Sequence, residues 1–162
     1  MKKIVLALCL IYMLVHGANG QQKITEWKMT DVENHITQNK DAILVINFWA
    51  TFCKPCVAEI PSFIDVCNRY KDKKVSLLLI SLDLPSFYPK KIAAFAAKHH
   101  FNTPIVWLNE SNADYFCPKV DAKWSGSIPA TLVINTKNGK RIFFEEEITG
   151  EALEKAILEV ER

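Results

Sequence analysis

The sequence predicts a single α/β domain whose mixed central sheet has helices on both faces. Two continuous apolar runs, at residues 42–49 and 75–82, are typical of strands buried on both sides, as in the parallel part of a sheet. Segments with apolar residues at helical spacing, at residues 53–71 and 90–100, alternate with these strands. The Asn-Gly pair at positions 138–139 predicts a hairpin, and a hairpin adds antiparallel strands to the sheet.

The start of the chain carries the features of a secretory signal. Two lysines precede an apolar run at residues 4–15, and small residues follow just before position 21. We expect cleavage after Gly20 and export to the periplasm or another extracytoplasmic space. If the signal were retained, it would tether the domain to the membrane. The predicted organisation is a signal peptide at residues 1–20 and one domain at residues 21–162.

Charge gives no indication of a nucleic-acid partner. Lys2 and Lys3 are two of the 20 basic residues, and none of the 18 acidic residues precedes position 21. The predicted mature chain therefore carries 18 residues of each sign, with no basic stripe, so no nucleic acid is expected to bind. Export also places its four cysteines where thiols tend to become oxidised.

The first half of the domain is expected to form a lead-in, a strand and a helix. Residues 23–40 should include a short helix that Thr30 caps. The buried strand at residues 42–49 follows. Apolar residues then recur at helical spacing from residue 53 to residue 71, and Pro61 should interrupt and kink this helix.

The second half is expected to complete the sheet and to add the last helices. Residues 109–127, with scattered Asn, Ser and Gly, should be irregular. The expected elements are a strand at 75–82, a helix at 90–100, strands at 104–108, 131–135 and 141–144, and a helix at 149–161.

A Cys-x-x-Cys segment lies where the first buried strand gives way to a helix. There, unpaired backbone N–H groups and the positive end of the helix dipole favour a thiolate and lower the pKa of the first thiol. Lys54 adds positive charge, and Pro55 occupies the helix start without needing a donor. We expect Cys53 to be the nucleophile and Cys56 the resolving thiol of a redox-active disulfide that needs no cofactor.

The same motif has two structural interpretations, a plain disulfide or half of a zinc site. A zinc site needs a second close pair of ligands, which Cys67, His99, His100 and Cys117 do not supply, so no metal is expected. The sequence leaves open whether Cys67 and Cys117 are free thiols or a second disulfide.

Residues 48–56, Phe-Trp-Ala-Thr-Phe-Cys-Lys-Pro-Cys, resemble the active-site segment of thioredoxin-like proteins. They are most similar to the exported bacterial thiol–disulfide oxidoreductases of the TlpA/ResA type. Further matches are Pro61 as the helix proline, Glu59 as an acid common in that branch, and Ile128-Pro129 as the cis-proline loop. The resemblance covers nearly all of residues 23–162 and implies a thioredoxin fold.

Two residues depart from the wider family. Phe52 stands where a Trp usually precedes the first cysteine, which changes the rim that meets a substrate. Asn47 stands where cytoplasmic thioredoxins have a buried Asp, which removes one proton acceptor, although Asn is frequent in the exported branch.

The resemblance implies roles for residues around the cysteines. Glu59 lies one helical turn beyond Cys56 and is expected to take the proton from its thiol. The cis-proline loop would present its backbone to an extended substrate segment. The residues expected to bind substrate are Trp49, for which core packing is the alternative, and Phe52, Lys54, Pro55, Ile128 and Pro129.

The leading functional hypothesis is an oxidoreductase that exchanges disulfides with exported protein substrates, as part of redox homeostasis outside the cytoplasm. Strong oxidants of this fold usually have a His between the cysteines, and Lys54-Pro55 favours a reductase instead. We expect a monomer. The resemblance further implies a membrane electron donor of the thiol-transport type and cytochrome c maturation as one task of this branch.

Four alternatives belong to other functional classes. A disulfide oxidase or isomerase would use the same cysteines. A peroxidase of the peroxiredoxin group should have Thr three residues before its reactive cysteine, where this chain has Ala50. A copper chaperone of this fold uses a longer cysteine spacing and a late His, which is absent near Ile128. A non-catalytic interaction module would keep only the fold.

Overall fold

Six strands form one mixed sheet in the order β1-β4-β3-β2-β5-β6. The computed structural model describes residues 22–162, so the predicted signal peptide at 1–20 lies outside the described residues. The first four strands pair in parallel, β5 pairs antiparallel with β2, and β6 pairs antiparallel with β5 to form a hairpin. The strands are β1 (Thr25–Trp27), β2 (Ile43–Trp49), β3 (Val75–Ser81), β4 (Ile105–Leu108), β5 (Ala130–Asn135) and β6 (Arg141–Phe144). This is the predicted thioredoxin fold.

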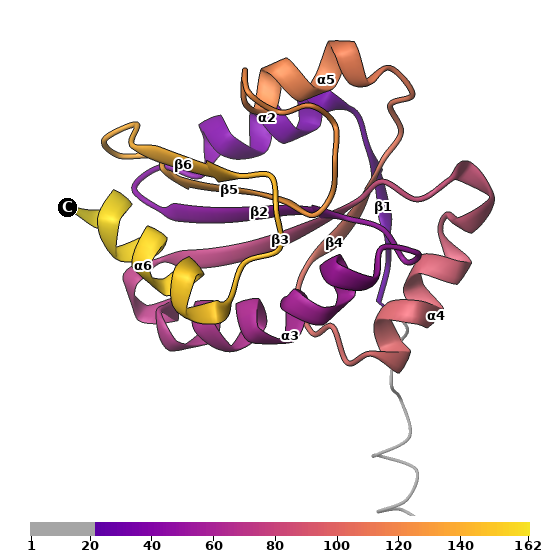
Figure 1. The fold of residues 1–162 in the computed structure, drawn as a ribbon, viewed down its shortest axis with the longest axis horizontal. Coiled ribbons are helices and arrows are strands. Elements are labelled where there is room, and N and C mark those ends of the chain that lie inside the picture. Colours follow the sequence, from indigo (N-terminus) through magenta and orange to yellow (C-terminus); the bar gives the residue numbers. More distant parts are fainter. Residues whose placement is uncertain (1–21) are drawn as a thin grey trace, which may run out of the picture.

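Helices cover both faces of the sheet (Figure 1). One face carries α3 (Lys54–Arg69), α4 (Lys90–Lys98) and α6 (Gly150–Glu161), and the other carries α2 (Met29–Gln38) and α5 (Ala113–Val120). Two apolar clusters, one on each side of the sheet, hold these layers together. Within residues 22–162, none of the helices combines the length and the apolar content that crossing a bilayer requires.

The central strand β2 shows why its sequence is apolar throughout. All seven of its residues are buried, and successive side chains point to opposite faces. Val45 and Trp49 pack beneath α3 and α6, whereas Leu44 and Phe48 pack beneath α2 and α5. At the end of the strand, Trp49 pairs with Ser81 of β3, and Phe48 pairs with Ala130 of β5. This register brings the loop that follows β2 and the loop that precedes β5 to the same end of the strands.

The lead-in differs from the prediction. The three residues of β1 pair in parallel with β4 at the edge of the sheet, and this strand was not predicted because so short a segment carries no clear periodicity. The predicted Thr30 cap is wrong. The helix α2 begins at Met29, and the carboxylate of Asp31 accepts a hydrogen bond from the backbone N–H of Lys28 at 2.7 Å.

The segment predicted to be irregular contains the helix α5. Its residues Phe116, Cys117 and Val120 are buried against the sheet at helical spacing. The scattered Asn, Ser and Gly residues around α5 are the reason why the sequence predicted no helix here. Pro118 lies inside this helix and removes one backbone donor. Burial of the apolar face offsets that loss. By contrast, α3 continues through Pro61 as one helix.

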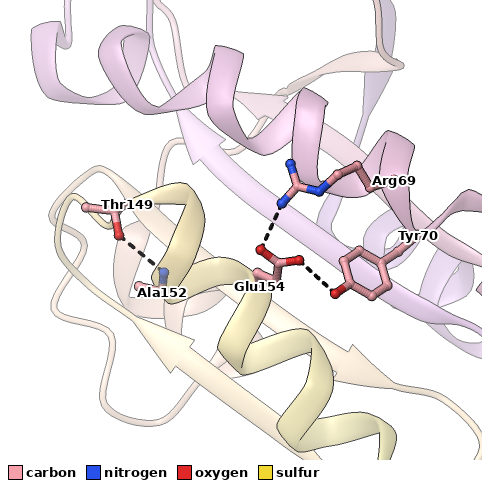
Figure 2. A network of polar contacts seen from close by, with 5 residues as sticks. All are labelled: Arg69, Tyr70, Thr149, Ala152 and Glu154. Carbon is pink, nitrogen blue, oxygen red and sulfur yellow. Dashed lines mark hydrogen bonds and ion pairs between the residues drawn. The ribbon is translucent and has the colours of Figure 1, made fainter.

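The C-terminal helix follows the prediction closely. Thr149 caps α6 by accepting a hydrogen bond from the backbone N–H of Ala152 at 3.2 Å (Figure 2). Figure 2 also shows Glu154 between two residues at the end of α3. Its carboxylate accepts hydrogen bonds from Arg69 at 2.8 Å and from the hydroxyl of Tyr70 at 2.7 Å. These contacts dock α6 against α3, the helix that carries the cysteines.

Candidate active site

The two cysteines of the Cys-x-x-Cys motif form a disulfide at the start of α3, as predicted. Cys53 is the N-cap residue of the helix and retains 8% of its surface exposed, whereas Cys56 is 0% exposed. An incoming sulfur atom therefore reaches Cys53 and not Cys56. This difference in exposure agrees with the prediction that Cys53 attacks the substrate and Cys56 resolves the mixed disulfide.

The helix start supplies a hydrogen-bond donor to the first sulfur atom. The backbone N–H of Cys56 points to the Sγ of Cys53 at 3.3 Å. Pro55 lies in the first turn of α3, where its missing N–H leaves no helical bond unmade. A thiolate at Cys53 would be stabilised by this N–H group and by the helix dipole.

Glu59 lies buried behind the disulfide, on the same helix and only 3% exposed. Its Oε1 accepts a hydrogen bond from the Nδ2 of Asn47 at 2.8 Å, and its Oε2 accepts one from the backbone N–H of Ile148 at 3.0 Å. Burial raises the pKa of Glu59 to about 7, although both hydrogen bonds act in the opposite direction. A carboxyl group that titrates near neutrality is suited to accept and return a proton.

Asn47 connects three elements beneath the site. Besides Glu59 on α3, its Nδ2 contacts the Oγ1 of Thr131 on β5 at 2.9 Å. Within residues 22–162, the Oδ1 of this buried amide has no hydrogen-bond partner. The sequence indicated only that Asn47 lacks the acidity of an Asp. The structure shows that it is the donor that holds the carboxylate of Glu59.

Asp83 holds the turn that carries Cys53 through hydrogen bonds to Thr51, and the sequence analysis did not identify it as a site residue. The backbone N–H of Thr51 lies 3.1 Å from both carboxylate oxygens of Asp83, and the hydroxyl of Thr51 donates to Oδ1 at 2.6 Å. Ser81 donates to Oδ2 at 2.8 Å. Asp83 is only 4% exposed. A signal was present, since an acid directly after a buried strand lies beside the end of the neighbouring parallel strand.

The predicted substrate-binding residues beside the cysteines divide into two groups. Phe52 is 65% exposed, and Lys54 and Pro55 are also exposed. Trp49 is 0% exposed and packs edge-on against Phe101 in the core. The substrate-binding role predicted for Trp49 is therefore wrong in this structure, because its position on β2 points the ring under the helices.

The loop before β5 comes to the same site. The Ile128–Pro129 peptide bond is cis, as predicted, and Pro129 is buried. Ile128 is half-buried and packs against the apolar cluster that contains Cys53 and Cys56. Within residues 22–162, the backbone N–H and C=O of Ile128 make no hydrogen bond. The structure thus leaves one unpaired backbone segment at the end of the sheet where β2 leads into the cysteines.

The remaining two cysteines of the described chain are free thiols. Cys67 lies in the cluster beneath α3, and Cys117 lies in the cluster on the opposite face of the sheet. The second disulfide that the sequence left open is therefore absent from residues 22–162. Burial raises the pKa of Cys67 to about 12, so this thiol stays protonated and unreactive.

Known proteins with similar sequences include thiol–disulfide oxidoreductases. The thiol-disulfide oxidoreductase ResA of Geobacillus thermodenitrificans is 29% identical over 108 residues, which cover 67% of this chain and 56% of that relative. ResA of Geobacillus kaustophilus is 27% identical over 118 residues, covering 71% and 62%. The chain thus spans about three-fifths of the length of these curated relatives.

A solved structure and a family model agree with this similarity. The thioredoxin-related protein from Neisseria meningitidis serogroup B is 26% identical, with a TM-score of 0.65 over 76% of this chain and 89% of that one. The model of the AhpC/TSA family matches residues 20–140, a stretch that includes both cysteines, Glu59 and the Ile128-Pro129 loop. The chain therefore belongs to the AhpC/TSA family of thioredoxin-like proteins.

Proposed function

We propose that this protein is a thiol–disulfide oxidoreductase that acts on exported protein substrates. The observation that carries the proposal is the asymmetric disulfide at the start of α3, with Cys53 accessible and Cys56 buried in front of Glu59. The named activity of the ResA relatives supports it. A disulfide with a purely structural role does not require a buried carboxyl group that titrates near neutrality, such as that of Glu59.

In the proposed reaction, the reduced protein begins with a thiolate at Cys53. This thiolate attacks one sulfur atom of a substrate disulfide, a mixed disulfide forms, and the other substrate sulfur leaves as a thiolate. Cys56 then loses its proton to Glu59 and attacks the Sγ of Cys53, which releases the second substrate thiol. The substrate gains two electrons, and the protein ends with the Cys53–Cys56 disulfide seen in the structure.

Substrate binding is proposed to use the unpaired backbone of Ile128 and the exposed side chains next to Cys53. An extended segment of the substrate can pair with the free N–H and C=O of Ile128, as in strand addition. Phe52, Lys54 and Pro55 would border this segment, since all three are exposed. Backbone pairing tolerates many sequences, which suits an enzyme that meets several protein substrates.

The cellular setting is part of the same proposal. We propose that residues 1–20 direct export and that residues 21–162 act outside the cytoplasm as a monomer without a cofactor. Lys54 and Pro55 support a reductase, because neither side chain stabilises the reduced state as a His between the cysteines does. A reductase needs electrons, which a membrane protein of the thiol-transport type would supply, and cytochrome c maturation is the task that this resemblance favours.

The test compares cysteine variants in an insulin-reduction assay. Cys53→Ser should abolish turnover, and Cys56→Ser should accumulate mixed disulfides through Cys53, because the resolving thiol is missing. Cys67→Ala is the matched control, since it removes a cysteine outside the pair and should keep full turnover. Full activity of Cys53→Ser would contradict the assignment. Peroxide consumption or tight copper binding by the wild-type protein would instead favour the peroxidase or the copper chaperone.

A further inference from the structure

A single carboxylate oxygen accepts several hydrogen bonds from the segment that leads into Ile128. The Oε1 of Glu145, directly after β6, accepts hydrogen bonds from the backbone N–H groups of Ser125 at 2.9 Å and Ser127 at 3.1 Å. The hydroxyl of Ser125 donates to the same oxygen. Gly126, with φ of +100°, lets the chain turn so that both N–H groups converge on one point.

Few other contacts hold this segment. Upstream, Trp124 is buried against Phe48, and its Nε1 donates to the carbonyl of Ser127 at 2.8 Å. Downstream, the first sheet pair is that of Ala130 with Phe48. Within residues 22–162, the N–H groups of Ser125 and Ser127 have the Glu145 carboxylate as their only hydrogen-bond partner. The path of the chain into Ile128 is therefore held by this carboxylate together with the Trp124 side chain.

We propose that Glu145 is a positioning residue that fixes the Ser125–Ser127 segment and so sets the affinity for protein substrates. The inference rests on the proposed function and on its use of the Ile128 backbone. A substrate strand gains hydrogen bonds only if the N–H and C=O of Ile128 already point outward, since ordering the loop during binding would subtract from the affinity. Glu145 touches neither sulfur atom of the disulfide in this arrangement and leaves the exchange chemistry to Cys53, Cys56 and Glu59.

The chain offers a matched control for Glu145. Glu146 is the next residue, carries the same charge and is exposed, and it makes no hydrogen bond within residues 22–162. Glu147 is less suitable, because its charge acts on the pKa of Glu59. A second route to the same perturbation is Gly126→Ala. Its Cβ would find ordinary contacts at 3.8 Å, but the positive φ disfavours any side chain there.

The experiment measures kcat and KM with two disulfide substrates, insulin and the small aromatic disulfide 5,5′-dithiobis(2-nitrobenzoate). Glu145→Ala should raise KM for insulin roughly three- to tenfold, the range expected for losing hydrogen bonds to a charged but solvent-accessible group. Its kcat and its rate with the small disulfide should stay at the wild-type level, because that substrate forms no strand pairing. Glu145→Gln keeps one acceptor oxygen and should recover part of the loss. Gly126→Ala should resemble Glu145→Ala, and Glu146→Ala should behave as wild type.

Two results would overturn the positioning role. One is an unchanged KM for insulin in both Glu145→Ala and Gly126→Ala. The other is an equal loss with insulin and with the small disulfide, which would mark general damage to the site. Failure of the proposed function itself would look different, since the wild-type protein would then reduce neither substrate.

Discussion

Replacing Glu59 with Gln should change both the pH dependence of stability and the second step of the exchange. The carboxyl group is buried, and its pKa is raised from 4.5 to about 7. A glutamine has nearly the same shape and stays neutral. Its single carbonyl oxygen can accept from Asn47 or from the N–H of Ile148, but not from both.

The effect on stability follows from proton linkage. Between pH 4.5 and about 7 the folded protein holds the Glu59 proton and the unfolded chain has lost it, so the free energy of unfolding falls as the pH rises. The contribution of the protonated carboxyl is fully present below pH 4.5 and is lost through pH 7. At about 1.4 kcal/mol per pKa unit, wild type should lose about 2–3 kcal/mol between pH 5 and pH 8 that Glu59→Gln does not lose.

The effect on catalysis concerns the buried thiol. Without a proton acceptor, Cys56 must reach its thiolate unaided, and resolution of the mixed disulfide should slow by about tenfold or more at pH 7. Formation of the mixed disulfide at Cys53 should keep its rate. Urea unfolding at pH 5 and pH 8 measures the first effect, and rapid mixing with acid quench and thiol alkylation measures the second. An identical pH slope in wild type and variant would refute titration of Glu59 in this range, and an unchanged resolution rate would refute its role as a base.

Two further predictions concern the geometry and the direction of the reaction. Thr51→Val removes the hydroxyl that Asp83 accepts at 2.6 Å and should destabilise the protein by about 1–2 kcal/mol and slow exchange at Cys53, whereas Thr51→Ser should keep both properties. Equal unfolding midpoints for the two variants would show that this hydrogen bond has no net effect. The reduction potential, measured by equilibration with glutathione or dithiothreitol, should lie nearer the roughly −270 mV of thioredoxin than the roughly −120 mV of a strong oxidant. A potential above about −180 mV would contradict the reductase direction.

Several elements were predictable because their signals are local. An unbroken apolar run predicts the buried strand β2, and the helical spacing of apolar residues at 149–161 predicts α6. Asn138 and Gly139 likewise placed the hairpin, in which Gly139 has the positive φ that such turns require. Local signals failed where they conflicted. Around α5, the scattered Asn, Ser and Gly residues outweighed the helical spacing of its three buried residues.

The sequence by itself determined the redox pair, because Cys53 and Cys56 need only a strand–helix junction to meet and to share the helix N-terminus. Glu59, which is close in the sequence, was also predicted, but other residues that shape the site come from distant positions, and only the tertiary structure decided their roles. Asp83 reaches Thr51 because β2 and β3 run in parallel and end together, and Glu145 reaches Ser125 because β6 returns beside β5. The burial of Trp49 was also decided by the tertiary structure. Its position in β2 places the ring on the face that α3 and α6 cover, away from a substrate. Contacts of this kind depend on strand order and register, and no short stretch of sequence specifies either.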